Sequence, residues 1–359
     1  MPPGRADAAR GRYDPRMNNN NYARALPGFL ASLVLFAAAP ATAQTAPLVI
    51  DKQGAFAIGG KVLGDAASSS LHCDHGVVEY QIPPQPRAVN LLMWHSASTV
   101  AWQNRWDGGE GFQSLFLRRG FPVYLWDGPR VGRANWGCAG TVYEPVAGRD
   151  QANFAAWRFG TVYPDWFDGV QFPRGDAEAW NQAMRARYQE FDTIDNAQLE
   201  SDAAAALADR IGPTVALTNS AGGLRALLTA MKSDNIVGIV AYENVGYVYP
   251  EGEAPDVEAG PFGPVAVSVA DFRKLTRIPL QMVWGDNTER SDRYRPTVAE
   301  SRRFVELVNR YGGKAEILLL PEAGLRGNTH IPFADLNNVA VADLLSNYLR
   351  EHSLDRRSR

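Results

Sequence analysis

Residues 215–224 read Val-Ala-Leu-Thr-Asn-Ser-Ala-Gly-Gly-Leu, an apolar run that leads into a serine among small residues. A helix-like pattern follows and continues to about Lys232. A strand, a sharp turn and a helix are the setting of a nucleophile elbow, in which the turn exposes a serine hydroxyl, here that of Ser220. The backbone N–H of the next residue, Ala221, would then point at a developing oxyanion.

The match to the usual Gly-X-Ser-X-Gly pattern is incomplete at its first position. Thr218 stands where that pattern has glycine, whereas Gly222 and Gly223 keep the start of the helix slim enough to pass the strand. A junction of strand, turn and helix with a capping serine has the same appearance, and such junctions are common. Other parts of the sequence are therefore needed to distinguish a nucleophile from a cap.

Composition narrows the class of protein. The chain has 359 residues, of which 45% are hydrophobic and 21% charged, and this is typical of a soluble globular protein. The formal net charge of −3 gives no electrostatic reason to expect a nucleic acid or an anionic membrane surface as a partner.

Residues 1–43 are typical of a secretory signal peptide. Arg24 precedes an apolar run over 26–39, and Ala41-Thr42-Ala43 supplies a cleavage signal of small residues before Gln44. The run is shorter than the roughly 20 residues that a membrane span needs, so we expect no stable membrane insertion. The predicted location is the periplasm or the outside of the cell.

The remaining chain contains two cysteines, Cys73 and Cys138. Export leads to an oxidising compartment, where an even number of cysteines favours a disulfide over two buried thiols. A bridge across this span would stabilise the fold by about 4 kcal/mol in the loop-entropy model.

Short apolar runs alternate with helical patterns along most of the chain. This alternation predicts a mostly parallel central sheet with helices on both faces, the α/β class. The runs fall near 89–94, 121–126, 215–219, 236–242, 280–284 and 315–320. A further run at 77–83 alternates in polarity and ends at Pro83-Pro84, which predicts a strand at an exposed edge.

A long irregular segment at about 140–195 interrupts this alternation and is rich in aromatic residues. An insertion of this length inside a compact domain is usually functional, so we expect a cap. Its aromatic side chains could form a packed cap core, line an apolar pocket, or do both. Residues 44–359 are thus expected to form one domain with a cap inserted before the strand that carries Ser220.

Four residues with useful chemistry fall at or just beyond the ends of predicted strands: Ser220, Glu243, Asp286 and His330. Ligands of open parallel sheets bind at the carboxyl ends of the strands, so this coincidence indicates a site. A serine hydroxyl needs a general base within hydrogen-bond reach and a partner that orients the base. His330 is the only histidine between His95 and His352, and it is the candidate base.

Two acids compete for the orienting position. Asp286 follows the strand before the last one, and Glu243 follows the strand next to that of Ser220. Either keeps the chain order serine, acid, histidine. Either could instead be a capping or salt-bridging carboxylate, and spacing leaves the choice open.

A second oxyanion donor is expected from the loop after Trp94, which reads His95-Ser96-Ala97. The backbone N–H of Ser96 or of Ala97 is the candidate, and His95 is interpreted as structural.

Several segments together resemble a small family of exported bacterial serine esterases of the α/β-hydrolase fold. The resemblance extends from about residue 75 to 352, and its most specific pieces lie in the cap. The segments are His95-Ser96-Ala97, Asp127 to Gly132-Arg133, Trp157-Arg158-Phe159-Gly160 with Tyr163-Pro164-Asp165, Gln171-Phe172-Pro173, Asn219-Ser220-Ala221-Gly222 and Gly327-Asn328-Thr329-His330.

This resemblance implies a catalytic triad of Ser220, His330 and Glu243, because in the family the triad acid follows strand six. It also implies that Ala97 and Ala221 donate to the oxyanion. The family's type has adjacent cysteines where this chain has Ala97-Ser98, so the resemblance does not extend to pocket shape or substrate.

The resulting expectation is a secreted carboxylesterase-like serine hydrolase that acts on a small ester through an acyl-enzyme. The aromatic residues of the cap favour an apolar or aryl ester. A peptidase or amidase with the same triad, and a non-catalytic binding protein on a hydrolase scaffold, are the alternatives. No His/Cys/Asp cluster has metal-ligand spacing, so no metal or organic cofactor is expected. The oligomeric state is not predicted.

Overall fold

The computed structural model describes residues 46–95, 98–140, 144–258 and 260–358. The predicted signal peptide over 1–43 and two residues of the oxyanion loop, Ser96 and Ala97, therefore lie outside the described residues.

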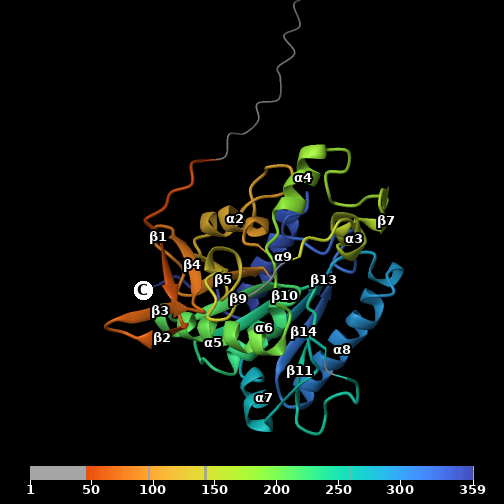
Figure 1. Ribbon diagram of the computed structural model, residues 1–359. Helices are drawn as coiled ribbons and strands as arrows, with labels where there is room; N and C mark the ends of the chain where they lie inside the picture. The colour runs from red at the N-terminus through yellow and green to blue at the C-terminus, as the bar shows by residue number, and fades with distance from the viewer. Residues whose placement is uncertain (1–45, 96–97, 141–143, 259, 359) are drawn as a thin grey trace, which may run out of the picture. The chain divides into compact units, whose positions relative to one another are not determined.

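An eight-stranded sheet runs through the middle of the described chain, in the order β1-β4-β6-β5-β9-β10-β13-β14 (Figure 1). From β6 to β14 each strand is parallel to its neighbour, whereas β4 is antiparallel to both β1 and β6. The strands are β1 Lys52–Ile58, β4 Gly76–Ile82, β5 Asn90–His95, β6 Val123–Asp127, β9 Thr214–Asn219, β10 Ile236–Tyr242, β13 Pro279–Trp284 and β14 Lys314–Leu319. The predicted mostly parallel sheet is confirmed.

The sheet differs from expectation at one strand. The sequence predicts an edge strand at residues 77–83, but β4 is the second strand of the sheet. The edge is occupied by β1, which pairs with β4 from Lys52 opposite Ile82 to Ile58 opposite Gly76. Alternating polarity is equally compatible with an antiparallel strand near the edge, and β1 is the edge strand itself.

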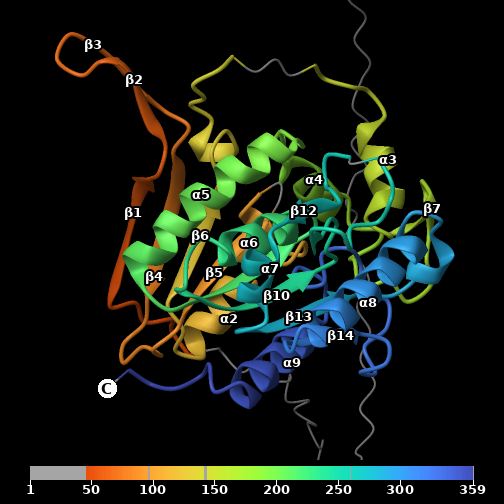
Figure 2. The same cartoon turned by 90° about the horizontal axis from the view of Figure 1, so that it is seen from below.

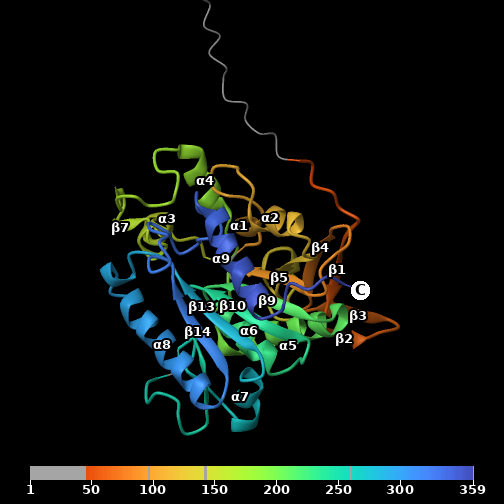
Figure 3. The same ribbon diagram turned by 180° about the vertical axis from the view of Figure 1, so that it is seen from behind.

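Helices cover both faces of the sheet, because successive strand residues point to opposite sides. In β9, Val215 and Leu217 belong to the apolar cluster of α1, α2 and α9, whereas Ala216 packs with α6, α7 and α8. Helix α5 packs on the same side as α6, and Figures 1 and 3 show α5 and α6 on one face and α9 on the other. The helices are α1 Val100–Gln103, α2 Phe112–Arg118, α5 Ile194–Ile211, α6 Gly222–Ala230, α7 Val269–Leu275, α8 Tyr294–Arg310 and α9 Asn338–Glu351.

Between β6 and α5 the chain leaves the sheet, first through η1 Gly132–Ala134 and then through the predicted cap segment. The elements of the cap segment are α3 Arg149–Ala156, β7 Gly160–Val162, β8 Asp165–Trp166 and α4 Ala177–Arg185. Five aromatic rings of this segment contact one another at centroid distances of 4.4 to 6.2 Å: Phe154, Phe159, Trp166, Phe172 and Trp180. These rings form a packed core of the cap segment.

The antiparallel hairpin of β2 Lys61–Asp65 and β3 Ser69–Cys73 projects from the body of the fold (Figure 2). Cys73 at its end is joined to Cys138 by the expected disulfide, with the two Cα atoms 5.0 Å apart. A small parallel pair, β11 Val248–Pro250 and β12 Val265–Val267, and the short helix η2 Thr288–Arg290 complete the described elements. No helix among the described residues is long and apolar enough to cross a membrane.

Candidate active site

Ser220 occupies a sharp turn between the end of β9 and the start of α6. Its φ of 54° is a conformation that non-glycine residues seldom adopt. The turn is held at both sides, since Ser220 N donates to Tyr242 O at 3.0 Å and Gly223 N donates to Ser220 O at 3.1 Å. A Cβ at Gly223 would lie 1.7 Å from Asn244 Oδ1, so only glycine fits there. The predicted elbow geometry is therefore present, and the bulk of Thr218 does not prevent it.

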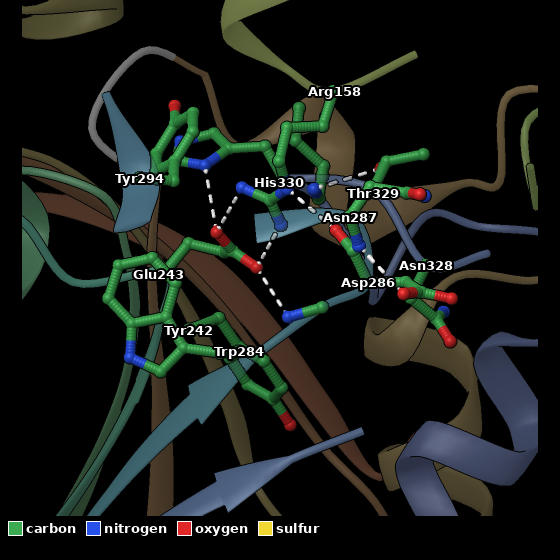
Figure 4. A network of polar contacts seen from close by, with 12 residues as sticks. Arg158, Tyr242, Glu243, Trp284, Asp286, Asn287, Tyr294, Asn328, Thr329 and His330 are labelled. Carbon is green, nitrogen blue, oxygen red and sulfur yellow. Dashed lines mark hydrogen bonds and ion pairs between the residues drawn. The ribbon is translucent and has the colours of Figure 1, made fainter. Parts of the chain in front are cut away.

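Glu243 follows directly after β10 and faces His330 (Figure 4). Its carboxylate is completely buried, and its Oε2 lies 3.3 Å from His330 Nδ1. Glu243 also has a positive φ, 56°, and its N–H donates to Val283 O at 2.8 Å. The backbone turn after the strand aims the carboxylate along the strand ends, toward the imidazole.

Asp286, the competing acid, has other partners. Its Oδ2 accepts from Gly327 N at 2.8 Å, and its Oδ1 accepts from Asn287 N at 2.7 Å. Its own N–H donates to Asn328 O at 2.9 Å. Both carboxylate oxygens are thus engaged by backbone N–H groups, and Asp286 holds the loop that carries the histidine.

Further contacts fix the backbone around His330 in the loop between β14 and α9. Asn219 Nδ2 donates to His330 O at 2.9 Å, and His330 N donates to Trp157 O at 2.9 Å. The buried carboxylate of Asp335 accepts from Thr329 N at 2.7 Å and from Thr329 Oγ1 at 2.8 Å. These contacts tie the loop to the nucleophile strand, to the cap segment and to the start of α9.

Arg158 of the cap segment forms an ion pair with Glu243 (Figure 4). Its Nη1 and Nη2 donate to Glu243 Oε2 and Oε1 at 2.6 and 2.5 Å, and both side chains are buried. Gly285 N adds a third hydrogen bond to Oε1 at 2.5 Å. Each oxygen of the buried carboxylate is therefore satisfied, as a buried charge requires.

This environment determines the charge states of Glu243 and His330, which are called the pair from here on. Burial raises the pKa of Glu243, but the Arg158 guanidinium and the hydrogen bond with His330 outweigh burial, so the carboxyl's pKa is lower than usual. Burial lowers the pKa of His330. Glu243 raises it but does not cancel the effect of burial, and the positive charges of Arg158 and Arg293 lower it further. The pair therefore favours an ionised acid beside a neutral imidazole, the state that a general base requires.

One cavity of about 140 Å³ contains Ser220, Ala221 and His330 in its lining. Ala221 is the N-cap residue of α6, so its N–H lies at the positive end of a helix. His95 also lines the cavity, and burial lowers its pKa to about 3, which keeps the ring neutral. Its Nδ1 accepts from Ser98 N at 3.1 Å, as expected for a structural histidine. The second predicted donor, Ala97, lies outside the described residues, as does its alternative Ser96.

The rest of the cavity lining mixes aromatic and charged side chains. The aromatic residues are Trp157, Phe262 and Tyr294. The charged residues are Arg149, Arg187, Glu190, Asp192 and Arg293. Most aromatic residues of the cap segment pack against one another instead, so composition overstated how apolar the cavity is.

Sequence reasoning missed Arg158 and Asp335 as parts of the site. In the sequence, Arg158 stands out only within the segment Trp157-Arg158-Phe159-Gly160 that carries the resemblance, and Asp335 belongs to none of the motifs described above. The one available signal is physical, since a buried acid such as Glu243 needs a cation, but the chain has 36 Lys and Arg residues from which to choose. Among the described residues, no group of three or more His, Cys, Asp or Glu side chains is placed to hold a metal ion.

The parallel sheet, the strained serine turn and the histidine loop define the α/β-hydrolase fold, which confirms the predicted fold class. The chain is similar to a bacterial esterase of known structure, with a TM-score of 0.72 and 25% identity, covering 86% of this chain and 98% of that one. It is also similar to the probable secreted lipase phiG of Fungal sp. (strain ATCC 74256), with 24% identity in an alignment 316 positions long that covers 77% of this chain and 85% of the lipase. No protein-family model matches the chain. The predicted resemblance to bacterial esterases is thereby confirmed.

Proposed function

We propose that this protein is a carboxylic ester hydrolase that works through an acyl-enzyme on Ser220. The observation that carries the proposal is the 3.3 Å contact between His330 Nδ1 and Glu243 Oε2, beside a cavity that Ser220 also lines. The similarity to an esterase and to a probable lipase supports the class of reaction.

In the proposed mechanism, Nε2 of His330 takes the proton of Ser220 as the hydroxyl attacks the ester carbonyl. Glu243 holds the imidazole in the required tautomer and stabilises the imidazolium that forms. The N–H groups of Ala221 and Ala97 are the proposed donors to the oxyanion. The imidazolium of His330 then gives this proton to the departing alcohol, which leaves the acyl group on Ser220. Water attacks the acyl-enzyme with His330 again as base, and the proton returns to Ser220 as the carboxylic acid is released.

The proposed substrate is a small ester. Trp157, Phe262 and Tyr294 support an apolar or aryl group near the reacting carbonyl, because they are the aromatic residues in the cavity lining. Comparing neutral aryl esters with aryl esters that carry a carboxylate tests this choice, since arginines share the lining.

Export is part of the proposal. Disulfides such as that between Cys73 and Cys138 persist mainly in oxidising compartments, and the similar fungal protein is described as secreted. The predicted signal peptide over 1–43 would supply the route to the periplasm or the medium.

The test is hydrolysis of a short-to-long series of aryl esters by the mature protein, with Ser220→Ala beside it and with labelling by a serine-reactive phosphonate. We expect ester turnover and stoichiometric labelling by the wild type, and neither by the variant. Cleavage of anilides in preference to esters would indicate an amidase or peptidase. A wild type that neither turns over substrate nor reacts with the phosphonate would indicate a binding protein.

A further inference from the structure

The carboxylate of Glu243 is completely buried, and its cation comes from a distant part of the chain. Arg158 precedes Glu243 by 85 residues and belongs to the cap segment, not to the sheet. Its guanidinium meets the carboxylate side by side, with one N–H donating to each oxygen at 2.6 and 2.5 Å. This paired geometry fixes the plane of the carboxylate as well as its charge.

Arg158 is itself held by several neighbours. Its Nε donates to Asp286 O at 2.8 Å, and its guanidinium lies 4.5 Å from the ring centroid of Tyr294. Tyr294 OH in turn donates to Ala156 O at 2.5 Å. The φ of Arg158 is 56°, a conformation that persists in a non-glycine residue only where the surroundings enforce it.

The cap segment also contacts His330, the partner of Glu243. Trp157 O accepts from His330 N at 2.9 Å, so neighbouring cap residues hold the acid and the histidine. Because Arg158 and Trp157 are adjacent, one turn of the cap segment sets the relative position of Glu243 and His330.

We propose that Arg158 is a positioning residue for the esterase reaction: its paired hydrogen bonds hold the Glu243 carboxylate toward His330, so the catalytic centre is complete only with this turn of the cap in place. The proposal rests on the function proposed above. Arg158 does not touch the reacting atoms and acts through Glu243.

The charge of Arg158 gives this role a measurable signature. The active form needs an ionised Glu243 and a neutral His330, so it appears when the pair loses its last proton. A nearby positive charge favours that loss. Replacing Arg158 by a neutral residue must therefore move the loss to higher pH, whichever partner holds the proton. A residue that supported the fold from a place where its charge did not reach the pair would leave the pH of this step unchanged.

Other charged or titratable groups face the pair. Arg293 and Tyr294 come from the start of α8, His95 comes from the end of β5, and Asp335 follows the histidine loop. The cavity that His330 lines also contains charged residues from α3 and from the segment before α5: Arg149, Arg187, Glu190 and Asp192. Burial raises the pKa of Glu190 to about 7. Burial raises the pKa of Asp335 to about 7, in the range where the pair is measured, and Arg158 lowers it. A test must therefore separate Asp335 from Glu243.

The experiment compares full-length mature wild type, Arg158→Met and Arg158→Lys in kcat and in the pH dependence of kcat/KM on an aryl ester. For Arg158→Met we expect kcat to fall by about 100-fold, as for other small displacements of a catalytic group. The acid limb of its kcat/KM profile, where activity rises with pH, should move to higher pH by about one unit or more. Arg158→Lys keeps the charge but not the paired geometry. Its acid limb should therefore lie at the same pH as that of the wild type, and its kcat should fall less than that of Arg158→Met.

Arg130 supplies a matched control, because it makes a similar paired contact with the buried Asp74 at 2.8 and 3.0 Å, away from Glu243. Arg130→Met should lose stability without moving the acid limb. Combining Arg158→Met with Asp335→Asn should preserve the upward movement. If the movement vanishes in the double variant, or if Arg158→Met matches Arg130→Met, the proposal is overturned.

Should Arg158→Met fail to fold, Arg158→Lys decides, because it keeps the positive charge and loses the paired hydrogen bonds to Glu243. We expect its kcat to fall with the acid limb unmoved, and a kcat equal to that of the wild type would overturn the role of Arg158. Failure of the proposed function itself looks different, because then the wild type would have no esterase activity and Ser220→Ala would change nothing.

Discussion

Two residues of the proposed triad share the same unusual backbone conformation. Ser220 and Glu243 each follow directly after a buried parallel strand, and their φ angles are 54° and 56°. In this conformation the chain turns abruptly at the end of the strand, and the side chain points along the sheet edge instead of into a face. Adjacent strands that end in this conformation present a hydroxyl and a carboxylate to one loop histidine.

The turn at Ser220 depends on a close backbone approach at Gly223. A methyl group there would meet Asn244 Oδ1 at 1.7 Å inside the core, so Gly223→Ala should destabilise the protein by about 1–3 kcal/mol. Urea unfolding followed by circular dichroism measures this loss.

Gly140 is the control for that substitution, since no atom lies within 4 Å of the position of an added Cβ. Gly140→Ala should leave the midpoint close to that of the wild type. Equal stability of the two variants would mean that the turn can relax around a side chain at 223.

His330 gives a prediction about pH. Burial lowers its pKa in the folded protein below the ordinary 6.5, although Glu243 opposes this. Because the base must be neutral, the acid limb of kcat/KM should have its midpoint below pH 6.5, and activity should persist in mildly acidic buffer. A midpoint above pH 7 on several esters would show that the neutral form is not favoured in the free enzyme.

At the scale of elements, the disulfide ties the end of the β2–β3 hairpin to the segment after η1. It links residues 65 positions apart, and the loop-entropy model assigns such a bridge about 4 kcal/mol of stability. The doubly substituted Cys73→Ser/Cys138→Ser protein should unfold at correspondingly lower urea concentration than the oxidised wild type.

The same substitution should leave the kcat of the folded protein nearly unchanged, because neither cysteine lines the cavity that contains Ser220. Reduced wild type should behave like the double variant. A large loss of kcat at unchanged stability would place the bridge in the catalytic machinery instead.

Much of the element plan follows from the sequence, because buried parallel strands are continuous apolar runs. The same logic predicts that four residues lie at the carboxyl ends of the parallel strands, and the structure has them there: Ser220, Glu243, Asp286 and His330. The choice between the acids does not follow, since it depends on which way a side chain turns after its strand. The position of Arg158 is likewise set by tertiary packing. The same holds for the pairing of β1 with β4, which makes β1 the edge strand.

For the whole molecule, the signal-peptide proposal predicts a mature chain that begins at Gln44. Expression in a Gram-negative host, followed by intact-mass measurement of the protein from the periplasm or medium, tests it. Substituting Ala41 and Ala43 by bulky residues should block processing and leave the precursor in the cell fraction. An unprocessed chain recovered outside the cytoplasm would contradict the proposed cleavage site.

The whole account depends most on the pairing of Glu243, rather than Asp286, with His330. The decisive measurement is kcat/KM for a short aryl ester with wild type, Glu243→Gln and Asp286→Asn. We expect Glu243→Gln to lose about 10⁴-fold in rate, as a triad acid does. Asp286→Asn should stay much closer to the wild type, because its oxygens hold only the loop backbone. The reverse order, with activity lost at Asp286 and kept at Glu243, would contradict the proposed triad and the role of Arg158.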